Sequence, residues 1–248
     1  MLEQTDATKK AKNEIIEDIL KELPSDVAIE VELPSENKLY TLEDPTSPIT
    51  LRPMTFEDEK HLVSAKQGED PINLVLQRCL TNLKVLDLLP MDKLYLIMKL
   101  REVSYGDEYS TLLICKSCKA ENPTKIHLSE LNVNPVPDDF SEPIEVELKT
   151  IKKKAKIRLP RVRDERQTKN AGEALDHLWR FVVEIDGHTD KSIIAPVVDK
   201  LPLRDIRHIL KAIQTDFGLD TMIKFECNQC GEISVVDLPI DANFFDVS

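Results

Sequence analysis

The stretch FECNQCGEISVV, residues 225–236, lies near the end of a chain of 248 residues. It reads as a β-strand, a tight turn that contains Cys227, Cys230 and Gly231, and a second β-strand. A glycine after the second cysteine allows the backbone to double back. Such a turn presents two sulfur atoms to one ion, whereas a structural zinc ion takes four ligands. The stretch therefore predicts half of a zinc site and requires a second half elsewhere.

The second half is found 112 residues earlier, where Cys115 and Cys118 form another Cys-x-x-Cys turn. At this offset further pairs coincide: Pro90 and Pro202, Leu94 and Ile206, Ile97 and Ile209, Lys99 and Lys211, Tyr105 and Phe217, Gly106 and Gly218. Upstream, an offset of 107 aligns Pro53 with Pro160 and Asp58 with Glu165. A repeated order of elements is typical of duplicated units. We therefore expect two units of about 90–100 residues, packed about a pseudo-twofold axis.

Packing of this kind would bring Cys115, Cys118, Cys227 and Cys230 to one structural Zn²⁺ ion, which closes a long loop of the chain. Lys119 stands where the second turn has Gly231, so the first turn is less regular. Two alternatives stay open. A redox dithiol requires a cysteine of lowered pKa at a helix N-terminus, and packed thiols without metal require no ligand geometry. The fifth cysteine, Cys79, is predicted to lie in the core.

Periodicity predicts an α+β protein that begins with a short amphipathic helix over residues 8–22. Its apolar residues, Ile15, Ile16, Ile19 and Leu20, are candidate partner-binding residues, although they could equally pack on their own domain. Alternating residues predict hairpins over 27–41 and 144–159. Helical spacing predicts helices over 72–80, 91–104, 175–185 and 203–214. The Pro-rich, acidic segment 131–143 predicts a boundary. The expected organisation is an N-terminal helix and hairpin arm over 1–45, a first repeat over 46–135 and a second repeat over 142–248.

Composition excludes several classes of protein. No apolar run reaches the roughly 18 residues of a membrane span, and the N-terminus lacks the pattern of a signal peptide. We therefore expect a soluble protein made in a cytoplasm. The sequence contains no P-loop, HExxH, nucleophile elbow or Gly-rich dinucleotide turn, so no enzyme and no small-molecule substrate are predicted. The acidic pairs at 58–59 and 164–165 fit helix starts, and DGHTD, residues 186–190, fits a polar turn.

The net charge of -12 makes general binding to nucleic acid unfavourable. The segment 149–169 nevertheless holds ten basic residues against two acidic ones. In a hairpin, Lys154, Lys156 and Arg158 would line one face. This segment keeps one alternative function open, that of a nucleic-acid-binding zinc-ribbon accessory protein.

Several stretches together resemble one protein family: LPSENKLY, LRPMTFEDEKHL, SYGDEY before ICKSC, FECNQCGE and the terminal DANFF. Their order and the paired cysteine turns are similar to the baseplate-hub and hub-assembly proteins of T-even-type contractile-tailed bacteriophages. The resemblance implies a non-enzymatic protein that contacts other baseplate and hub proteins. It also implies assembly in the host cytoplasm, and leaves open whether the protein stays in the tail baseplate of the virion.

Overall fold

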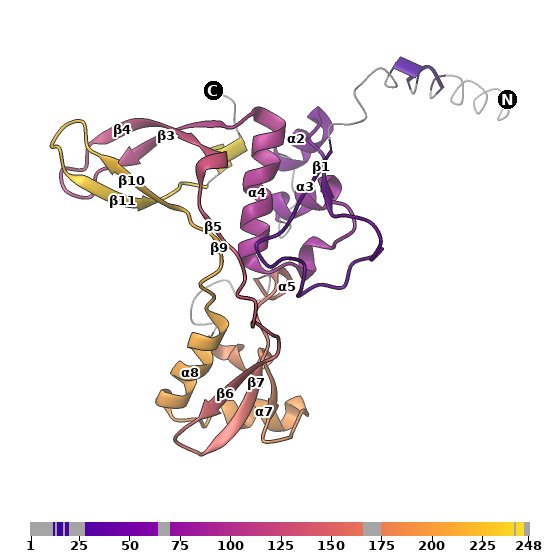
Figure 1. Cartoon of the computed structure of the whole chain (residues 1–248), viewed down its shortest axis with the longest axis vertical. Helices are drawn as coiled ribbons and strands as arrows, with labels where there is room; N and C mark the ends of the chain where they lie inside the picture. Colours follow the sequence, from indigo (N-terminus) through magenta and orange to yellow (C-terminus); the bar gives the residue numbers. More distant parts are fainter. Residues whose placement is uncertain are drawn as a thin grey trace.

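The computed structural model describes residues 12, 14–16, 18–19, 28–63, 70–165, 175–240 and 242–245. Over these residues the protein is α+β, as predicted, with helices and several small antiparallel sheets. Figure 1 shows an upper body built around one long helix, two hairpin arms that extend from its side, and a lower body below a narrow neck.

The upper body packs three helices around one hydrophobic core. These are α2 (Phe56–Val63), α3 (Pro71–Cys79) and α4 (Pro90–Tyr105), with the 3-10 turn η2 (Val85–Asp87) between the last two. Asp70 caps α3 by accepting hydrogen bonds from two backbone amides, and α3 and α4 each begin with a proline, which suits the first helical turn. The helices predicted over 72–80 and 91–104 are thus confirmed. The C-terminal turn η5 (Ala242–Phe245) joins this core through Phe244, which packs edge-on against Tyr109.

The hairpin predicted over 27–41 is wrong. Strand β1 (Ile29–Glu30) pairs with β2 (Thr50–Leu51) instead, with Ile29 opposite Leu51. The residues between them form turns, and the hydroxyl of Tyr40 donates to the carboxylate of Asp92 while it accepts from the amide of Leu89. These contacts hold Tyr40 against α4 and away from β1. Alternation of apolar and polar residues within 27–41 could not reveal the contact of Tyr40 with Asp92, because Asp92 lies 52 residues further along the chain.

The two arms are antiparallel hairpins of similar build (Figure 1). The first pairs β3 (Glu108–Ile114) with β4 (Glu121–His127), and the second pairs β10 (Met222–Glu226) with β11 (Ile233–Asp237). The strand–turn–strand order predicted around both cysteine pairs is confirmed. Each hairpin therefore carries its Cys-x-x-Cys turn at its outer end.

The neck contains the segment 131–143. Strand β5 (Val133–Asn134) follows the turn η3 (Leu128–Glu130) and pairs with β9 (Gly218–Leu219). A small core lies here, and it consists of Leu89, Val136, Leu159 and Phe217. The Pro-rich segment is thus tied into the structure by hydrogen bonds and by the buried side chain of Val136.

The lower body is a three-stranded sheet, β6 (Ile144–Leu148), β7 (Lys153–Ile157) and β8 (Val182–Ile185), packed with helices α7 (Lys191–Val198) and α8 (Leu203–Ile213). The short turn η4 (Leu178–Arg180) completes it, whereas the short turn α5 (Val162–Glu165) packs on the upper body, where Val162 joins the core. The hairpin over 144–159 and the helix over 203–214 are confirmed. The helix predicted over 175–185 is wrong, because its second half is β8. Val182 and Ile185 are β-branched residues buried where β8 meets β7, and this tertiary contact outweighs their helical spacing.

One ion-pair arrangement occurs twice, once after β2 and once after β7. Arg52 donates to the carboxylate of Asp58 at 2.7 Å and to the carbonyl oxygen of its neighbouring residue at 2.8 Å. Arg158 does the same with Asp164, at 2.8 Å, and its own neighbour, at 3.1 Å. The offset between the two sets is 106, so the alignment of Asp58 with Glu165 at an offset of 107 is wrong by one residue. Pro53 and Pro160, which suggested the offset of 107, therefore do not occupy equivalent places in the two units.

The strand pairs preceding these arginines also match. Ile29 lies opposite Leu51 in the upper body, and Ile144 lies opposite Ile157 in the lower body. A backbone amide after the first strand then donates to a buried aspartate in the first turn of the long helix. In the upper body the amide of Ser35 donates to Asp92, and in the lower body the amide of Thr150 donates to Asp205. Both bodies therefore share strand pairing and a helix anchor.

Candidate metal centre

Each pair of cysteines is held by the same backbone turn. The amide of Cys115 donates to the carbonyl of Ala120 at 2.9 Å, and the amide of Lys119 donates back to the carbonyl of Cys115 at 3.0 Å. In the second arm, the corresponding bonds of Cys227 measure 3.0 and 2.9 Å. Lys119 takes a positive φ of 63°, close to the 70° of Gly231. The turn thus keeps its geometry although the lysine carries a Cβ.

The two turns bring four sulfur atoms together. All four Sγ atoms lie within 4.8 Å of one another. Across the arms, Cys115 Sγ lies 3.8 Å from Cys230 Sγ, and Cys118 Sγ lies 3.6 Å from Cys227 Sγ. A tetrahedral zinc ion with Zn–S bonds of about 2.3 Å requires sulfurs about 3.8 Å apart. The predicted ligand set is therefore assembled at distances that fit one such ion.

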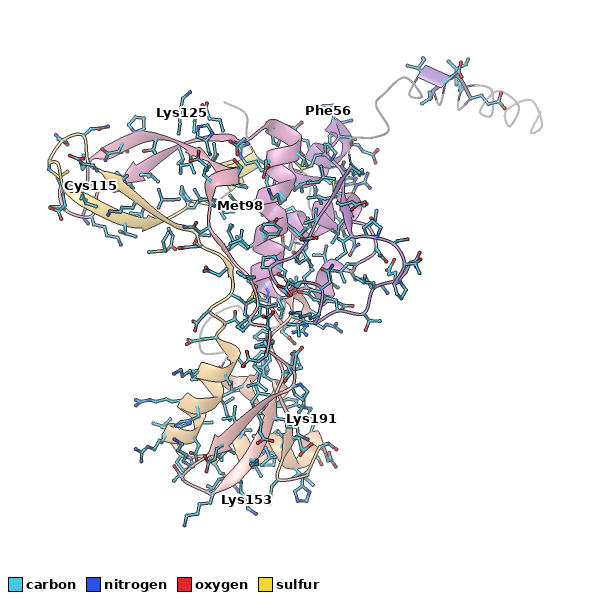
Figure 2. All side chains as sticks on the ribbon, in the orientation of Figure 1. Phe56, Met98, Cys115, Lys125, Lys153 and Lys191 are labelled. Atoms are coloured by element: carbon cyan, nitrogen blue, oxygen red, sulfur yellow. The ribbon has the colours of Figure 1, made fainter. Side chains whose placement is uncertain are left out.

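Two polar side chains form hydrogen bonds between the two cysteine turns. The amide of Lys116 donates to Ser234 Oγ at 3.4 Å, and the amide of Asn228 donates to Asn122 Oδ1 at 2.8 Å. Both acceptors are buried, at equivalent places 112 residues apart. The contacts are reciprocal, because each arm supplies one amide and one acceptor. Figure 2 shows Cys115 at the outer end of the arms, where these contacts lie.

Asn122 and Ser234 were missed in the sequence, although a signal was present. Each stands at an inward-facing strand position between exposed neighbours, where an apolar residue is the usual choice. A buried polar residue needs a hydrogen-bond partner. That partner lies on the other arm and cannot be identified without the packing of the two hairpins.

Backbone amides favour the thiolate form at two of the four cysteines. The amides of Cys118 and Ser117, together with the hydroxyl of Ser234, lower the pKa of Cys115 to about 6. The amides of Cys230 and Gln229 lower the pKa of Cys227 as well. At Cys230 the amide of Glu232 lowers the pKa, but the neighbouring sulfurs outweigh it and raise the value to about 12. A divalent cation would supply the positive charge that four clustered thiolates require.

The surroundings of the cysteines differ from those of a redox dithiol. Both pairs lie in turns between strands and away from any helix N-terminus in the described chain. The sulfur–sulfur contacts of 3.6 and 3.8 Å run between the arms, so that each thiol faces a cysteine of the other hairpin. This arrangement fits shared ligation of one ion better than a dithiol within one turn.

The candidate partner-binding residues lie near the N-terminus. Ile15, Ile16 and Ile19 are helical and at least half exposed, so they do not pack on the described core. Leu20 lies outside the described residues. Three large apolar side chains on this short segment are therefore exposed in the structure.

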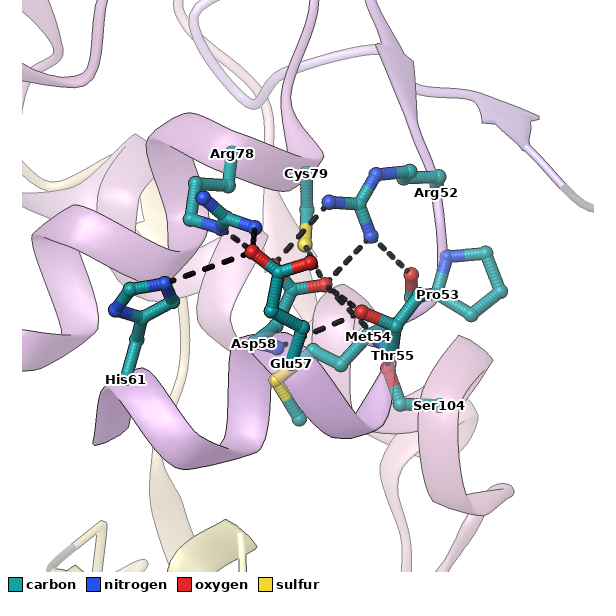
Figure 3. Close-up of polar contacts among 10 residues, drawn as sticks. All are labelled: Arg52, Pro53, Met54, Thr55, Glu57, Asp58, His61, Arg78, Cys79 and Ser104. Atoms are coloured by element: carbon teal, nitrogen blue, oxygen red, sulfur yellow. Dashed lines mark hydrogen bonds and ion pairs between the residues drawn. The ribbon is translucent and has the colours of Figure 1, made fainter. Parts of the chain in front are cut away.

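Cys79 is fully buried, as predicted, and lies beside a buried ion network in the upper body. Figure 3 shows Asp58 between Arg52 and Arg78, with the Cys79 thiol facing the same carboxylate. Burial raises the pKa of Asp58, but hydrogen bonds from the two arginines and Thr55 outweigh it and hold the pKa well below its usual range. This network joins α2 and α3 to the residue that follows β2, so Asp58 has a structural role.

Three lysines of the basic segment form ion pairs within their own sheet. Lys153 pairs with Asp186 at 2.5 Å, Lys154 with Glu145 at 2.6 Å, and Lys156 with Glu184 at 2.8 Å. Each of these acids lies on or beside a neighbouring strand. A phosphate backbone would have to displace these carboxylates, which disfavours the nucleic-acid alternative.

Comparison with known proteins places the chain in a family. No helix in the described parts of the chain has both the length and the apolar character needed to span a membrane. No curated protein and no solved structure matches the chain. A family model described as T4 bacteriophage base plate protein matches residues 25–246, which include both bodies and all four clustered cysteines. The chain therefore belongs to the family of T4 bacteriophage base plate proteins.

Proposed function

We propose that the protein is a non-enzymatic component of the tail baseplate hub, or a factor that assembles the hub. The observation that carries this proposal is the family match over residues 25–246. The resemblance of the LPSENKLY, SYGDEY and DANFF stretches to hub and hub-assembly proteins supports the narrower role. Its partners would be other baseplate and hub proteins, met in the host cytoplasm during assembly and, for a retained component, in the virion.

We further propose that Cys115, Cys118, Cys227 and Cys230 hold one structural Zn²⁺ ion. The sulfur–sulfur distances and the amides that face the sulfurs support this assignment. Four sulfur ligands close the coordination shell, so the ion would serve structure and not catalysis. It would join residues more than 100 positions apart, and it would hold the second arm against the first.

We infer that the chain arose by duplication of one unit. The recurring strand register, arginine–aspartate pair and helix anchor support this inference. The repeats predicted at 46–135 and 142–248 are its proposed outline, and the shared contacts extend the first unit back to β1. Each unit then ends in a hairpin arm, and the two arms meet about the reciprocal contacts of Asn122 and Ser234.

The experiment that tests the function uses the phage that encodes this chain. A nonsense mutation in the gene should leave tail fibres and heads intact but yield no complete baseplates, as seen by electron microscopy and sedimentation of infected-cell extracts. Supplying the wild-type chain from a plasmid should restore them. Complete baseplates with normal hubs in the mutant infection would contradict the proposal. Mass spectrometry of purified particles then separates a retained component from an assembly factor.

A further inference from the structure

A groove of about 680 Å³ runs between β6 and α8 on the lower body. Four consecutive residues of β6, from Ile144 to Glu147, line one side of it. Successive residues of a strand point to opposite faces of a sheet. A groove that touches four in a row therefore lies along the edge of the strand and exposes its backbone.

This edge of the sheet is open. The strand order is β6-β7-β8, and in the described chain no strand lies on the outer side of β6. Half of the backbone donors and acceptors of an edge strand point away from its only neighbour. At five residues and in regular register with β7, β6 can accept a further strand.

The opposite wall of the groove is basic. Arg207, His208 and Lys211 of α8 line it, and Lys149 lies at the end of β6. Within the described residues, none of these three lysine and arginine side chains forms an ion pair, whereas Lys153, Lys154 and Lys156 on β7 are all paired. Unpaired basic residues along an open groove stand out in a chain of net charge -12.

We propose that this groove binds an extended acidic segment of a partner protein, which adds to β6 as a fourth strand. Backbone hydrogen bonds to the strand edge would hold the segment. Acidic side chains at every second position would point towards α8 and meet Arg207 and Lys211. Glu145 and Glu147 also line the groove, on the face of β6 opposite Val146 and Leu148. A paired strand can keep its alternate acidic side chains on the α8 side and away from these glutamates, whereas the phosphates of a nucleic acid have no such alternation, so nucleic acid fits the groove less well. This surface is independent of the metal centre and goes beyond the proposed hub role.

The test uses the full chain and a fluorescein-labelled synthetic peptide of sequence ETETETE, with binding followed by fluorescence anisotropy at low salt. Three comparisons accompany it. The first is the peptide KTKTKTK, and the second is an ETETETE peptide N-methylated at every residue, which keeps its charges but has no backbone donor on either edge. The third compares the chain variant R207E/K211E with the matched variant K200E/R204E, whose exposed basic residues lie outside the groove.

Saturable binding of ETETETE to the wild-type chain is expected. The N-methylated peptide and the R207E/K211E chain should each weaken it about tenfold or more, whereas K200E/R204E should change it less than twofold. Circular dichroism should show that both variants keep their fold. Absence of saturable binding, equal binding of KTKTKTK, or equal binding of the N-methylated peptide would overturn the proposal. Equal losses of affinity in R207E/K211E and K200E/R204E would overturn it as well, because they would show that the overall charge of the chain determines binding and the groove does not.

Discussion

At the scale of single residues, the first cysteine turn contains a lysine where its counterpart contains a glycine. Lys119 has a φ of 63° and Gly231 has a φ of 70°. A positive φ brings the Cβ of an L-residue close to its own backbone and costs about 1–2 kcal/mol. Glycine has no such cost, although it loses more conformational entropy on folding.

Replacing Lys119 with glycine should therefore raise the free energy of unfolding by about 0.5–1 kcal/mol. The matched variant Gly231→Lys should lower it by a similar amount, since no other atom lies within 4 Å of the Cβ position there. Urea denaturation of both variants with equal metal content measures the two changes. A Lys119→Gly variant less stable than the wild type would show that the side chain makes a contact that outweighs its backbone strain.

Asp58 is the residue on which the upper ion network depends. Its side chain is fully buried and binds two arginines and Thr55. Because its pKa in the folded state is below the unfolded value near 3.8, the stabilisation is complete above that pH and is lost as the pH falls below it. Asp58→Asn leaves the two arginines without their shared charge and should cost about 3 kcal/mol at pH 7.

The measurement is denaturant unfolding at pH 7 and at pH 3.5. The loss caused by Asp58→Asn should be smaller at the lower pH, because Asp58 of the unfolded chain takes up a proton near pH 3.8 while the folded carboxylate, with its lowered pKa, stays ionised. Asp44→Asn, in an exposed loop, is the control and should have a small effect at both pH values. Equal losses for the two variants at pH 7 would rule out a stabilising role for the buried network.

At the scale of elements, the neck depends on the close approach of β9 to α4. Gly218 has a φ of 121°, and a Cβ added there would lie 2.9 Å from the Cβ of Met91. Gly106 also has a positive φ, 94°, but has open space around its Cβ position. The two glycines therefore separate the cost of the backbone conformation from the cost of a steric clash.

Gly106→Ala should lower the free energy of unfolding by about 1–2 kcal/mol through its backbone alone. Gly218→Ala should lower it by at least about 1 kcal/mol more, because α4 or β9 must move to make room. Thermal or urea unfolding of the two variants provides the comparison. If both variants lose the same stability, the contact between β9 and α4 is looser than the structure shows.

The elements also show how far the sequence could predict the fold. The helices α3, α4 and α8 and the hairpins around the cysteines have patterns that repeat within ten or so residues, so they were predictable. Strand β8 was not, because Val182 and Ile185 also fit a helical spacing and only β7 selects the strand. The pairing of β1 with β2 was not predictable either, because the alternation over 27–41 also fits a local hairpin, and Tyr40 bonds instead to Asp92, 52 residues away. The four cysteines were found from spacing, whereas Asn122 and Ser234 required the packing of both arms.

At the scale of the whole molecule, the exposed N-terminal isoleucines are proposed to bind a partner. The described core contacts begin at Val31. Removal of residues 1–24 should therefore leave the unfolding transition nearly unchanged but abolish co-purification with hub proteins from infected cells. The full-length variant I15D/I19D should show the same loss, while K12Q/E14Q, which changes exposed polar residues, should not. Undiminished co-purification of the truncated chain would exclude this surface.

The central claim is that one zinc ion joins the two arms and thereby the two halves of the chain. Elemental analysis of the full-length protein, purified under reducing conditions, tests it most directly. We predict one zinc per chain in the wild type and in Cys79→Ser, whose cysteine lies in the core, and loss of that zinc in Cys118→Ser and Cys230→Ser. A wild-type protein without zinc, or variants at Cys118 and Cys230 that keep it, would contradict the account.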